Sequence, residues 1–385
     1  MNPVYASLPT TIFEEMSGLA RAHDAINLGQ GFPDAAGPED VRRKAAEASV
    51  DGYNQYPPMR GLPELREAIA AHYGAHQGLA IDPDTQVCVT SGATEALAAS
   101  ILAVLSPGDE AIVIQPAYDA YAPLIRRAGA TPRFVSLAPP DWKLTRETLE
   151  SAVTAKTRAI VVNTPLNPLG TMMGEEELKV LAEFCIAHDL IAISDEVWEH
   201  VRFGGAAHRS PLDLPGMAGR TIKIGSAGKV FSLTGWKTGW AIAAPALIDM
   251  VAKAHQFLTF TTPPNLQTAV AYGLGKDDDY FAEMRAGYQR ARDRLAFGLE
   301  AAGYAVLAPP ATYFLSIDLA ASGIALDDRN FCRRIVEEHG VAAIPVSAFY
   351  EEEPVSHLAR LCFAKANAVL DVAIERLAGA RKALG

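Results

Sequence analysis

The amino-acid sequence predicts an α/β protein with a large domain, in which helices enclose a mostly parallel sheet, and a smaller α+β domain. In the middle of the chain, short continuous apolar runs alternate with helical patterns, as parallel strands buried on both faces do. Roughly the last hundred residues instead combine a long helix with short, separated strands. A chain of 385 residues is long enough to build one large core and a second, smaller one.

Composition and charge argue against several classes of protein. Hydrophobic residues make up 49% and charged residues 21% of the chain, as in an ordinary globular protein. The net charge is −11 and no long basic run occurs, which argues against nucleic acid and membrane surfaces as partners. The four cysteines form no CxxC pair, so we expect no disulfide framework or metal site, and a cytoplasmic location. Neither a signal peptide nor an apolar run of roughly 18 residues is found.

Six apolar runs predict the strands of the large sheet. The first run is followed by a helical pattern to about residue 105, and residues 174–188 form another. Ligands of such sheets bind at the carboxyl ends of the strands, so the residues directly after each run are candidates for the site. The predicted strands are residues 86–90, 110–115, 133–137, 159–163, 191–194 and 221–226.

The end of the chain predicts the smaller domain. A long helix covers about residues 280–302, short strands lie near residues 313–318 and 361–363, and a final helix closes the chain. The first forty residues are expected to return and pack beside this domain. The predicted division is therefore residues 1–40 for the returning segment, 41–284 for the large domain and 285–385 for the small domain.

Lys229 directly follows a predicted strand, in the segment Ser226-Ala-Gly-Lys229. A lysine just past a buried strand is poorly placed as a solvated surface charge, and lysine is the residue that forms Schiff bases with carbonyl groups. The alternatives are an ordinary loop lysine and a phosphate-binding P-loop. A P-loop requires Gly-x4-Gly-Lys-Ser/Thr, and this chain has Lys223 and Val230 at the first and last positions of that pattern.

Two further strand ends carry groups that suit a charged cofactor. Asp195 ends another apolar run, where a buried carboxylate can pair with a protonated ring nitrogen. It can equally cap a helix or join a structural ion pair. The segment Ser91-Gly-Ala-Thr-Glu95 follows a strand and opens a helix, whose free N–H groups and dipole form an anion site. The same segment also fits a capping box, which is compatible with phosphate binding.

Three other residues have a functional and a structural interpretation. Tyr118 could stack on a planar ring or belong to the core. Asn167 could donate to a ring oxygen or shape the turn before Pro168. Arg360 could bind a carboxylate through two hydrogen bonds or form a surface ion pair. Together, these strand-end residues supply the parts that a site for pyridoxal 5′-phosphate (PLP) requires.

With these residues in place, the sequence resembles the class I/II PLP-dependent aminotransferases of fold type I. The resemblance runs along nearly the whole chain and favours the branch of kynurenine aminotransferase, glutamine transaminase K and bacterial methionine aminotransferase. Its motifs are specific for the family and much less so for a substrate. They are TTIFEEM at 10–16, NLGQGFPD at 27–34, NQY at 54–56, SGATE at 91–95, NTPLNP at 163–168, SDEV at 194–197, SAGK at 226–229, TGWKTG at 234–239 and RLCFAK at 360–365.

The resemblance implies a role for each matching residue. Lys229 would form the Schiff base and then move a proton between the substrate Cα and the cofactor C4′. Asp195 would pair with the pyridinium nitrogen, Asn167 would donate to the 3-oxygen, and Tyr118 would stack on the ring. The phosphate would be held by Gly92, Ala93, Thr94, Ser226 and Lys237.

The resemblance also implies a substrate pocket and a homodimer. Arg360 would bind the substrate α-carboxylate, and Gly31 and Asn167 would line the same pocket. Tyr56 would reach the phosphate of the other subunit, so that the two active sites are shared.

Two positions depart from the family pattern. Trp198 stands where the family usually has a tyrosine that contacts the cofactor, which puts the stabilisation of the 3-oxygen in doubt. Leu169 stands where the usual Asn-Pro-Thr-Gly has threonine, which we interpret as a loop variation.

The resemblance therefore implies an aminotransferase that moves the amino group of an apolar, sulfur-containing or aromatic L-amino acid to a 2-oxo acid. The alternative within the fold is a cysteine-S-conjugate β-lyase, which would release pyruvate and ammonia without added oxo acid. A PLP-binding regulator is disfavoured, because no DNA-binding domain fits before residue 27.

Overall fold

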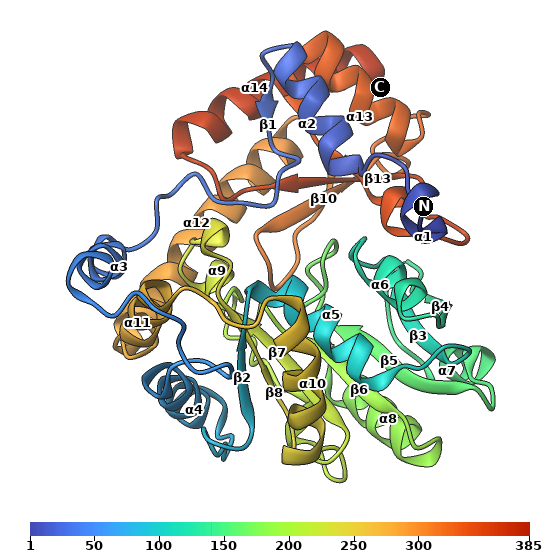
Figure 1. Cartoon of the computed structure of the whole chain (residues 1–385). Coiled ribbons are helices and arrows are strands. Elements are labelled where there is room, and N and C mark those ends of the chain that lie inside the picture. The colour runs from blue at the N-terminus through green and yellow to red at the C-terminus, as the bar shows by residue number, and fades with distance from the viewer. Residues whose placement is uncertain (140) are drawn as a thin grey trace.

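A seven-stranded sheet forms the centre of the larger part of the molecule (Figure 1). The computed structural model describes residues 1–139 and 141–385. Among the described strands of this sheet, β8 runs in one direction and the other six run in the opposite direction. In spatial order the strands are β2 (Val87–Thr90), β8 (Gly239–Ile242), β7 (Thr221–Ser226), β6 (Ile191–Asp195), β5 (Thr157–Asn163), β3 (Glu110–Gln115) and β4 (Thr131–Ser136).

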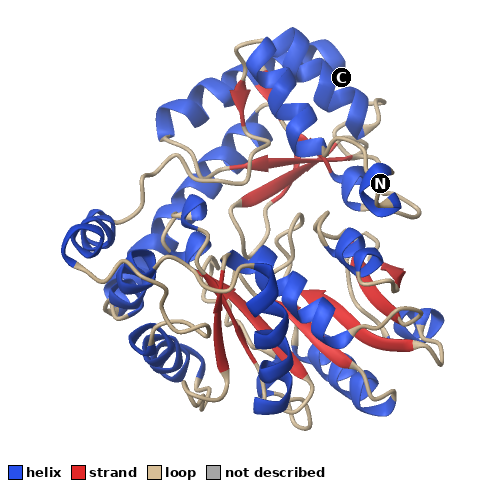
Figure 2. Ribbon diagram, viewed as in Figure 1, coloured by secondary structure: helices blue, strands red, loops and turns tan. Residues whose placement is uncertain are grey.

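Helices cover both faces of this sheet because its strands are apolar on both sides (Figure 2). In β7, Ile222 and Ile224 pack into the core that α5 and α10 cover. Residues of β8 on the other face, such as Trp240 and Ile242, pack with α4. The helices of this part are α3 (Glu39–Asp51), α4 (Pro63–Gln77), α5 (Gly92–Val104), α6 (Tyr121–Arg127), α7 (Arg146–Ala152), α8 (Glu175–Ala187), α9 (Ala227–Val230), α10 (Pro245–Leu258) and α11 (Pro264–Leu274).

The C-terminal part has two small sheets of its own. An antiparallel sheet has the order β12-β13-β10-β9, and β1 pairs in parallel with β11, so the N-terminal segment lies beside C-terminal elements (Figure 1). The strands are β1 (Ile26–Asn27), β9 (Ala305–Leu307), β10 (Phe314–Asp318), β11 (Val341–Ala342), β12 (Ile344–Pro345) and β13 (Leu358–Cys362). The helices are α2 (Ile12–Ala22), α12 (Asp278–Ala301), α13 (Asp328–His339) and α14 (Asn367–Leu384), whereas α1 (Pro3–Ala6) contacts α6 of the larger part.

The predicted fold class is confirmed, and every predicted strand of the large sheet is present. The strand β8 was not predicted, because it is only four residues long and begins at Gly239, the last residue of the glycine-containing motif at 234–239. The domain limits stay a prediction, and the proposed boundary at residue 284 falls inside the continuous helix α12. None of the described helices is both long and apolar enough to cross a membrane.

Candidate active site

A cavity opens where the carboxyl ends of β2, β3, β5, β6 and β7 meet the segments that follow them. Water can enter about 220 Å³ of it. This is the position that a parallel sheet covered on both faces favours for a ligand. The cavity is lined by Gly92, Ala93, Thr94, Leu97, Tyr118, Tyr121, Asn163, Asn167, Asp195, Val197, Trp198, Ser226, Gly228, Lys229, Thr234 and Lys237.

The N-terminus of α5 forms one wall of the cavity and is suited to an anion. Gly92, at the first turn, has φ +74°, and Lys237 approaches it so closely that a Cβ on Gly92 would lie 3.3 Å from Lys237 Cε. The first backbone N–H groups of α5, the Lys237 ammonium and the Ser226 hydroxyl therefore converge on the same wall. The capping box is half formed: Glu95 accepts a hydrogen bond from the Ser91 N–H, but the Ser91 side chain caps nothing.

Asp195 forms the acidic end of the cavity, away from the wall at the N-terminus of α5. Its carboxylate is only 5% exposed and accepts a hydrogen bond from the Tyr121 hydroxyl at 2.7 Å and a longer one from the Val197 N–H at 3.4 Å. Burial raises the pKa of Asp195, while the Tyr121 hydrogen bond acts in the opposite direction. A buried carboxylate that faces a cavity with so few donors is well placed to bind a cationic ring nitrogen.

Lys229 lies between these two ends. Its Nζ is 3.2 Å from the Tyr313 hydroxyl and 3.4 Å from the Gly31 carbonyl oxygen, and 4.6 Å from the centre of the Trp198 ring. The side chain keeps partial access to the cavity, but burial lowers the pKa of Lys229 to about 8. The neutral amine, the form that attacks a carbonyl carbon, is therefore accessible near neutral pH. Lys229 lies in the short helix α9 and is only partly exposed, so it is not a freely solvated lysine.

Arg360 joins the cavity from β13 through Asn167. Its Nη1 donates to Asn167 Oδ1 at 2.7 Å, its Nη2 donates to the Gly29 carbonyl at 2.9 Å, and its Nε–H is buried without a partner among the described residues. Arg360 is 1% exposed, so the interpretation as a surface ion pair is wrong. A guanidinium has five N–H donors, and the three that are not used here are available to a carboxylate.

The structure brings most of the predicted site residues together. Of the eleven predicted cofactor residues, ten line the cavity and Tyr56 does not. One of the ten, Asn167, is hydrogen-bonded to Arg360. Gly31 faces Lys229 through its carbonyl, whereas Tyr56 is 78% exposed and lies outside the cavity, against Phe260.

Two tyrosines of the site were not predicted from the sequence. Tyr121 binds Asp195, and its only signal was its place three residues after Tyr118. Tyr313 contacts Lys229 and packs edge-to-face on Trp198 with ring centres 4.4 Å apart, although it was expected only as the start of a strand.

With this geometry established, comparison with known proteins identifies the family. A profile of the family "Aminotransferase class I and II" matches residues 23–377. The chain belongs to the class I and II aminotransferases. It is 44% identical over 379 residues to a probable N-succinyldiaminopimelate aminotransferase, DapC, of Mycobacterium tuberculosis, covering 96% of this chain and 95% of that protein. It is 39% identical over 370 residues to the methionine aminotransferase of Escherichia coli, covering 96% of each chain.

Solved structures of aminotransferases have the same fold. The structure of N-succinyldiaminopimelate aminotransferase from Mycobacterium tuberculosis matches with a TM-score of 0.95 at 44% identity, over 98% of this chain and 99% of that one. An Escherichia coli protein with a methionine aminotransferase function matches with a TM-score of 0.95 at 38% identity, over 98% and 99% of the two chains. The predicted family and fold type are thus confirmed, and the protein is an aminotransferase.

Aminotransferases of this family and fold use PLP, as predicted, and the residues of the cavity fit this cofactor. PLP carries a phosphate, an aldehyde and a basic ring nitrogen. The α5 N-terminus with Ser226 and Lys237 suits the phosphate, Lys229 suits the aldehyde, and Asp195 suits the nitrogen.

Proposed function

We propose that this aminotransferase takes its amino group from an apolar, sulfur-containing or aromatic L-amino acid and passes it to a 2-oxo acid. The observation that carries the proposal is the surroundings of Arg360. The rings of Phe13, Phe314 and Phe349 lie around its guanidinium carbon, at 5.5, 3.9 and 5.1 Å from their centres. A substrate whose α-carboxylate reaches Arg360 would therefore meet aromatic walls, which favour an apolar side chain.

The side chains around the cavity supply the remaining functions in this proposal. PLP, when bound, supplies an aldehyde that forms imines with amines and a ring that accepts electrons from Cα. Lys229 holds the cofactor at rest and moves the proton between Cα and C4′, since its amine can be neutral near pH 8. Asp195 would keep the ring nitrogen protonated, and Asn167, which accepts a hydrogen bond from Arg360, would donate one to the cofactor 3-oxygen. Tyr118, which lines the cavity, would stack on the ring, and Trp198 packs beside Lys229.

We further propose that the protein is a homodimer in which each subunit contributes to the active site of the other. We also propose that it is located in the cytoplasm. Tyr56 and Phe260 form an exposed aromatic pair, 78% and 40% exposed, and Phe257, at the end of α10, is 87% exposed. Large exposed aromatic side chains are typical of an interface rather than of a solvated surface. The four cysteines are buried and unpaired, which is compatible with a reducing compartment.

The test is a half-reaction screen in which the purified holoenzyme is mixed with one amino acid at a time while the cofactor absorbance is followed. We expect methionine, glutamine, phenylalanine or kynurenine to react fastest. Among the described residues that line the cavity, the only cations are Lys229 and Lys237, both assigned to the cofactor, so aspartate and glutamate should be slow donors.

The Mycobacterium tuberculosis relative defines the competing outcome. A succinylated diaminopimelate has carboxylates far from its reacting amine, and they need cationic partners. If this compound, or aspartate, reacts faster than methionine and phenylalanine, the proposed substrate class is wrong, although the enzyme remains an aminotransferase.

A further inference from the structure

Lys223 is a lysine inside the large sheet. It is the third residue of β7, and its neighbours Ile222 and Ile224 face the core under α5. Because side chains alternate along a strand, Lys223 points to the opposite face, toward α4, and it is 0% exposed. A charged side chain at such a position is costly unless it is paired and hydrogen-bonded.

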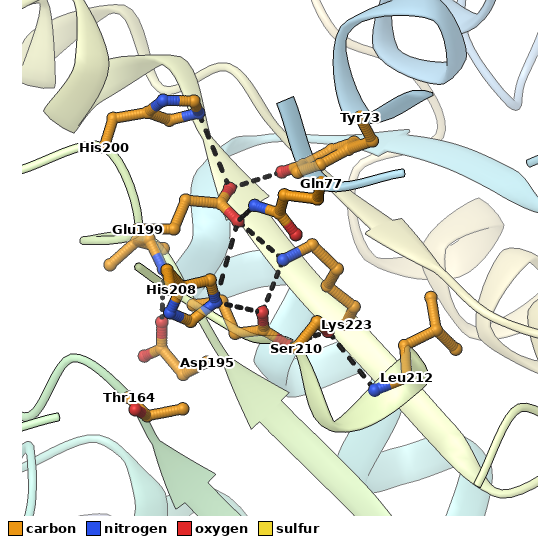
Figure 3. A network of polar contacts seen from close by, with 12 residues as sticks. Tyr73, Gln77, Thr164, Asp195, Glu199, His200, His208, Ser210, Leu212 and Lys223 are labelled. Carbon is orange, nitrogen blue, oxygen red and sulfur yellow. Dashed lines mark hydrogen bonds and ion pairs between the residues drawn. The ribbon is translucent and has the colours of Figure 1, made fainter. Parts of the chain in front are cut away.

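Two glutamates provide that pairing (Figure 3). Lys223 Nζ donates to Glu196 at 2.5 Å and to Glu199 at 2.6 Å. Burial is the largest effect and would raise the pKa of both carboxyls, but the Lys223 ammonium and the neighbouring histidines together hold the pKa of each below its ordinary value. The three groups are therefore charged together, and Lys223 is the cation between two buried anions.

Further donors complete the cluster, so that each carboxylate accepts three hydrogen bonds. Glu196 accepts from His208 at 2.6 Å and from Ser210 at 2.8 Å, besides Lys223. Glu199 accepts from Tyr73 at 2.5 Å and from Gln77 at 2.6 Å, both on α4, besides Lys223. The charged groups at the centre of this buried network are all paired, so a movement of any of them would leave a charge unpaired.

The cluster has the composition of a cation site. One oxygen of each glutamate and one nitrogen of His208 lie within 4.8 Å of one another, close enough to surround a single ion. Lys223 places its own ammonium against both carboxylates, so the chain supplies the cation itself.

The position of the two glutamates connects this cluster to the cavity. Asp195 and Glu196 are adjacent, and Glu196 and Glu199 enclose Val197 and Trp198 in the turn that follows β6. Asp195, Val197 and Trp198 all line the cavity. The turn is closed by a hydrogen bond from the Glu199 N–H to the Glu196 carbonyl at 3.0 Å. Lys223 thus holds both ends of the turn from behind the site.

We propose that Lys223 is a positioning residue, which fixes the turn from Asp195 to Glu199 and thereby the carboxylate and indole that face the cofactor. The inference rests on the proposed role of Asp195 as partner of the ring nitrogen. Lys223 itself touches neither cofactor nor substrate. Its loss should loosen cofactor binding and slow turnover while leaving amino-acid recognition by Arg360, on β13, unchanged.

The experiment compares Lys223→Met, which keeps the length of the side chain without its charge, with Lys276→Met. Lys276 is the matched control, because it pairs with Asp40 away from the cavity. We expect Lys223→Met to raise the Kd of PLP about tenfold or more, as loss of a supporting shell does at other sites, and to weaken the circular dichroism of the bound cofactor. We expect kcat to fall and KM for the amino donor to stay the same, and Lys276→Met to match the wild type in all of these.

A second variant covers the case in which Lys223→Met does not fold. Lys223→Met/Glu196→Gln/Glu199→Gln removes all three charges together, which costs less than leaving two buried anions unpaired. This variant should fold and still bind PLP weakly. The proposal is overturned if the variant that folds has the Kd for PLP and the cofactor circular dichroism of the wild type, even if its Tm is lower. Lys223 would then have a structural role only. A wild-type enzyme whose cofactor is not attached to Lys229 would instead refute the proposed function, so the two failures are distinguishable.

Discussion

At the scale of single residues, Arg360 is a buried guanidinium whose hydrogen bonds go to an amide oxygen and a backbone carbonyl. Burial lowers its pKa to about 10, so it remains charged at neutral pH. Neither partner carries a full negative charge. A substrate carboxylate would supply the missing anion, and its attraction is strong because the guanidinium is buried.

The first prediction is that Arg360→Lys weakens substrate binding without disturbing the cofactor. Lysine cannot reproduce two parallel hydrogen bonds, and one charged hydrogen bond contributes about 1.5–3 kcal/mol, so kcat/KM should fall roughly tenfold to hundredfold. Steady-state kinetics with the best donor measures this, and the absorbance spectrum serves as the control. An unchanged kcat/KM would remove Arg360 from the substrate site.

The second prediction concerns Trp198, which packs edge-to-face on Tyr313 and Phe314 with ring centres at 4.4 and 5.3 Å. A tyrosine there would donate a hydrogen bond to the cofactor 3-oxygen, stabilise its negative charge and favour loss of the proton from the lysine–cofactor linkage. We therefore expect Trp198→Tyr to lower the pH midpoint of the absorbance change of the holoenzyme. A pH titration of the wild type and of Trp198→Tyr measures this midpoint. An equal or higher midpoint in Trp198→Tyr would show that the 3-oxygen of the wild type already accepts a hydrogen bond from a second donor besides Asn167.

At the scale of the elements, the cavity wall that suits the cofactor phosphate, formed by the N-terminus of α5 with Ser226 and Lys237, depends on how closely β8 approaches α5. We call it the phosphate wall. Gly239 begins β8, and a Cβ there would lie 2.7 Å from the Gly92 carbonyl carbon, a backbone atom that cannot move away cheaply. The missed strand β8 is therefore what brings the first turn of α5 and Lys237 to one place.

The third prediction is that Gly239→Ala destabilises the fold by about 1–3 kcal/mol and also weakens PLP binding, because it displaces the N-terminus of α5. Urea unfolding and equilibrium dialysis measure the two effects. The control is Gly219→Ala, where an added Cβ meets nothing within 4 Å. If Gly239→Ala is destabilised but binds PLP with wild-type affinity, the contact between Gly239 and Gly92 does not contribute to phosphate binding and this prediction is wrong.

How far the sequence predicts this site follows from the same elements. Continuous apolar runs gave the strands, and the rule of carboxyl ends led to Lys229, Asp195 and Asn167, all of which line the cavity. Tyr313 could not be found this way, because it directly precedes β10 of the four-stranded antiparallel sheet and meets Lys229 only through tertiary packing. Lys223 was noted only as a failed P-loop position, since nothing in one strand indicates which glutamates it will meet.

At the scale of the whole molecule, the site is assembled from distant parts of the chain. The N-terminal segment supplies Gly29 and Gly31, β6 supplies Asp195, α9 supplies Lys229, and β13 supplies Arg360. Figure 1 shows where these elements lie. Tyr56 is the one predicted site residue that remains outside, exposed beside Phe260. We therefore expect it to act on a second copy of the chain.

The fourth prediction tests this sharing by mixing Lys229→Ala subunits with Tyr56→Phe subunits. Each variant alone should be impaired, but a mixed dimer contains one site with both Lys229 and the partner's Tyr56 intact. Random mixing should therefore restore about a quarter of wild-type activity. Activity no higher than the average of the two parent variants, or a monomer in light scattering, would refute the shared site.

The most direct test of the central claim is where the cofactor becomes attached to the chain. Borohydride reduction of the holoenzyme, followed by proteolysis and mass spectrometry, should place the pyridoxyl group on Lys229, and Lys229→Ala should lose both the label and nearly all turnover. A label on Lys223 or Lys237 instead, or full activity in Lys229→Ala, would contradict the account.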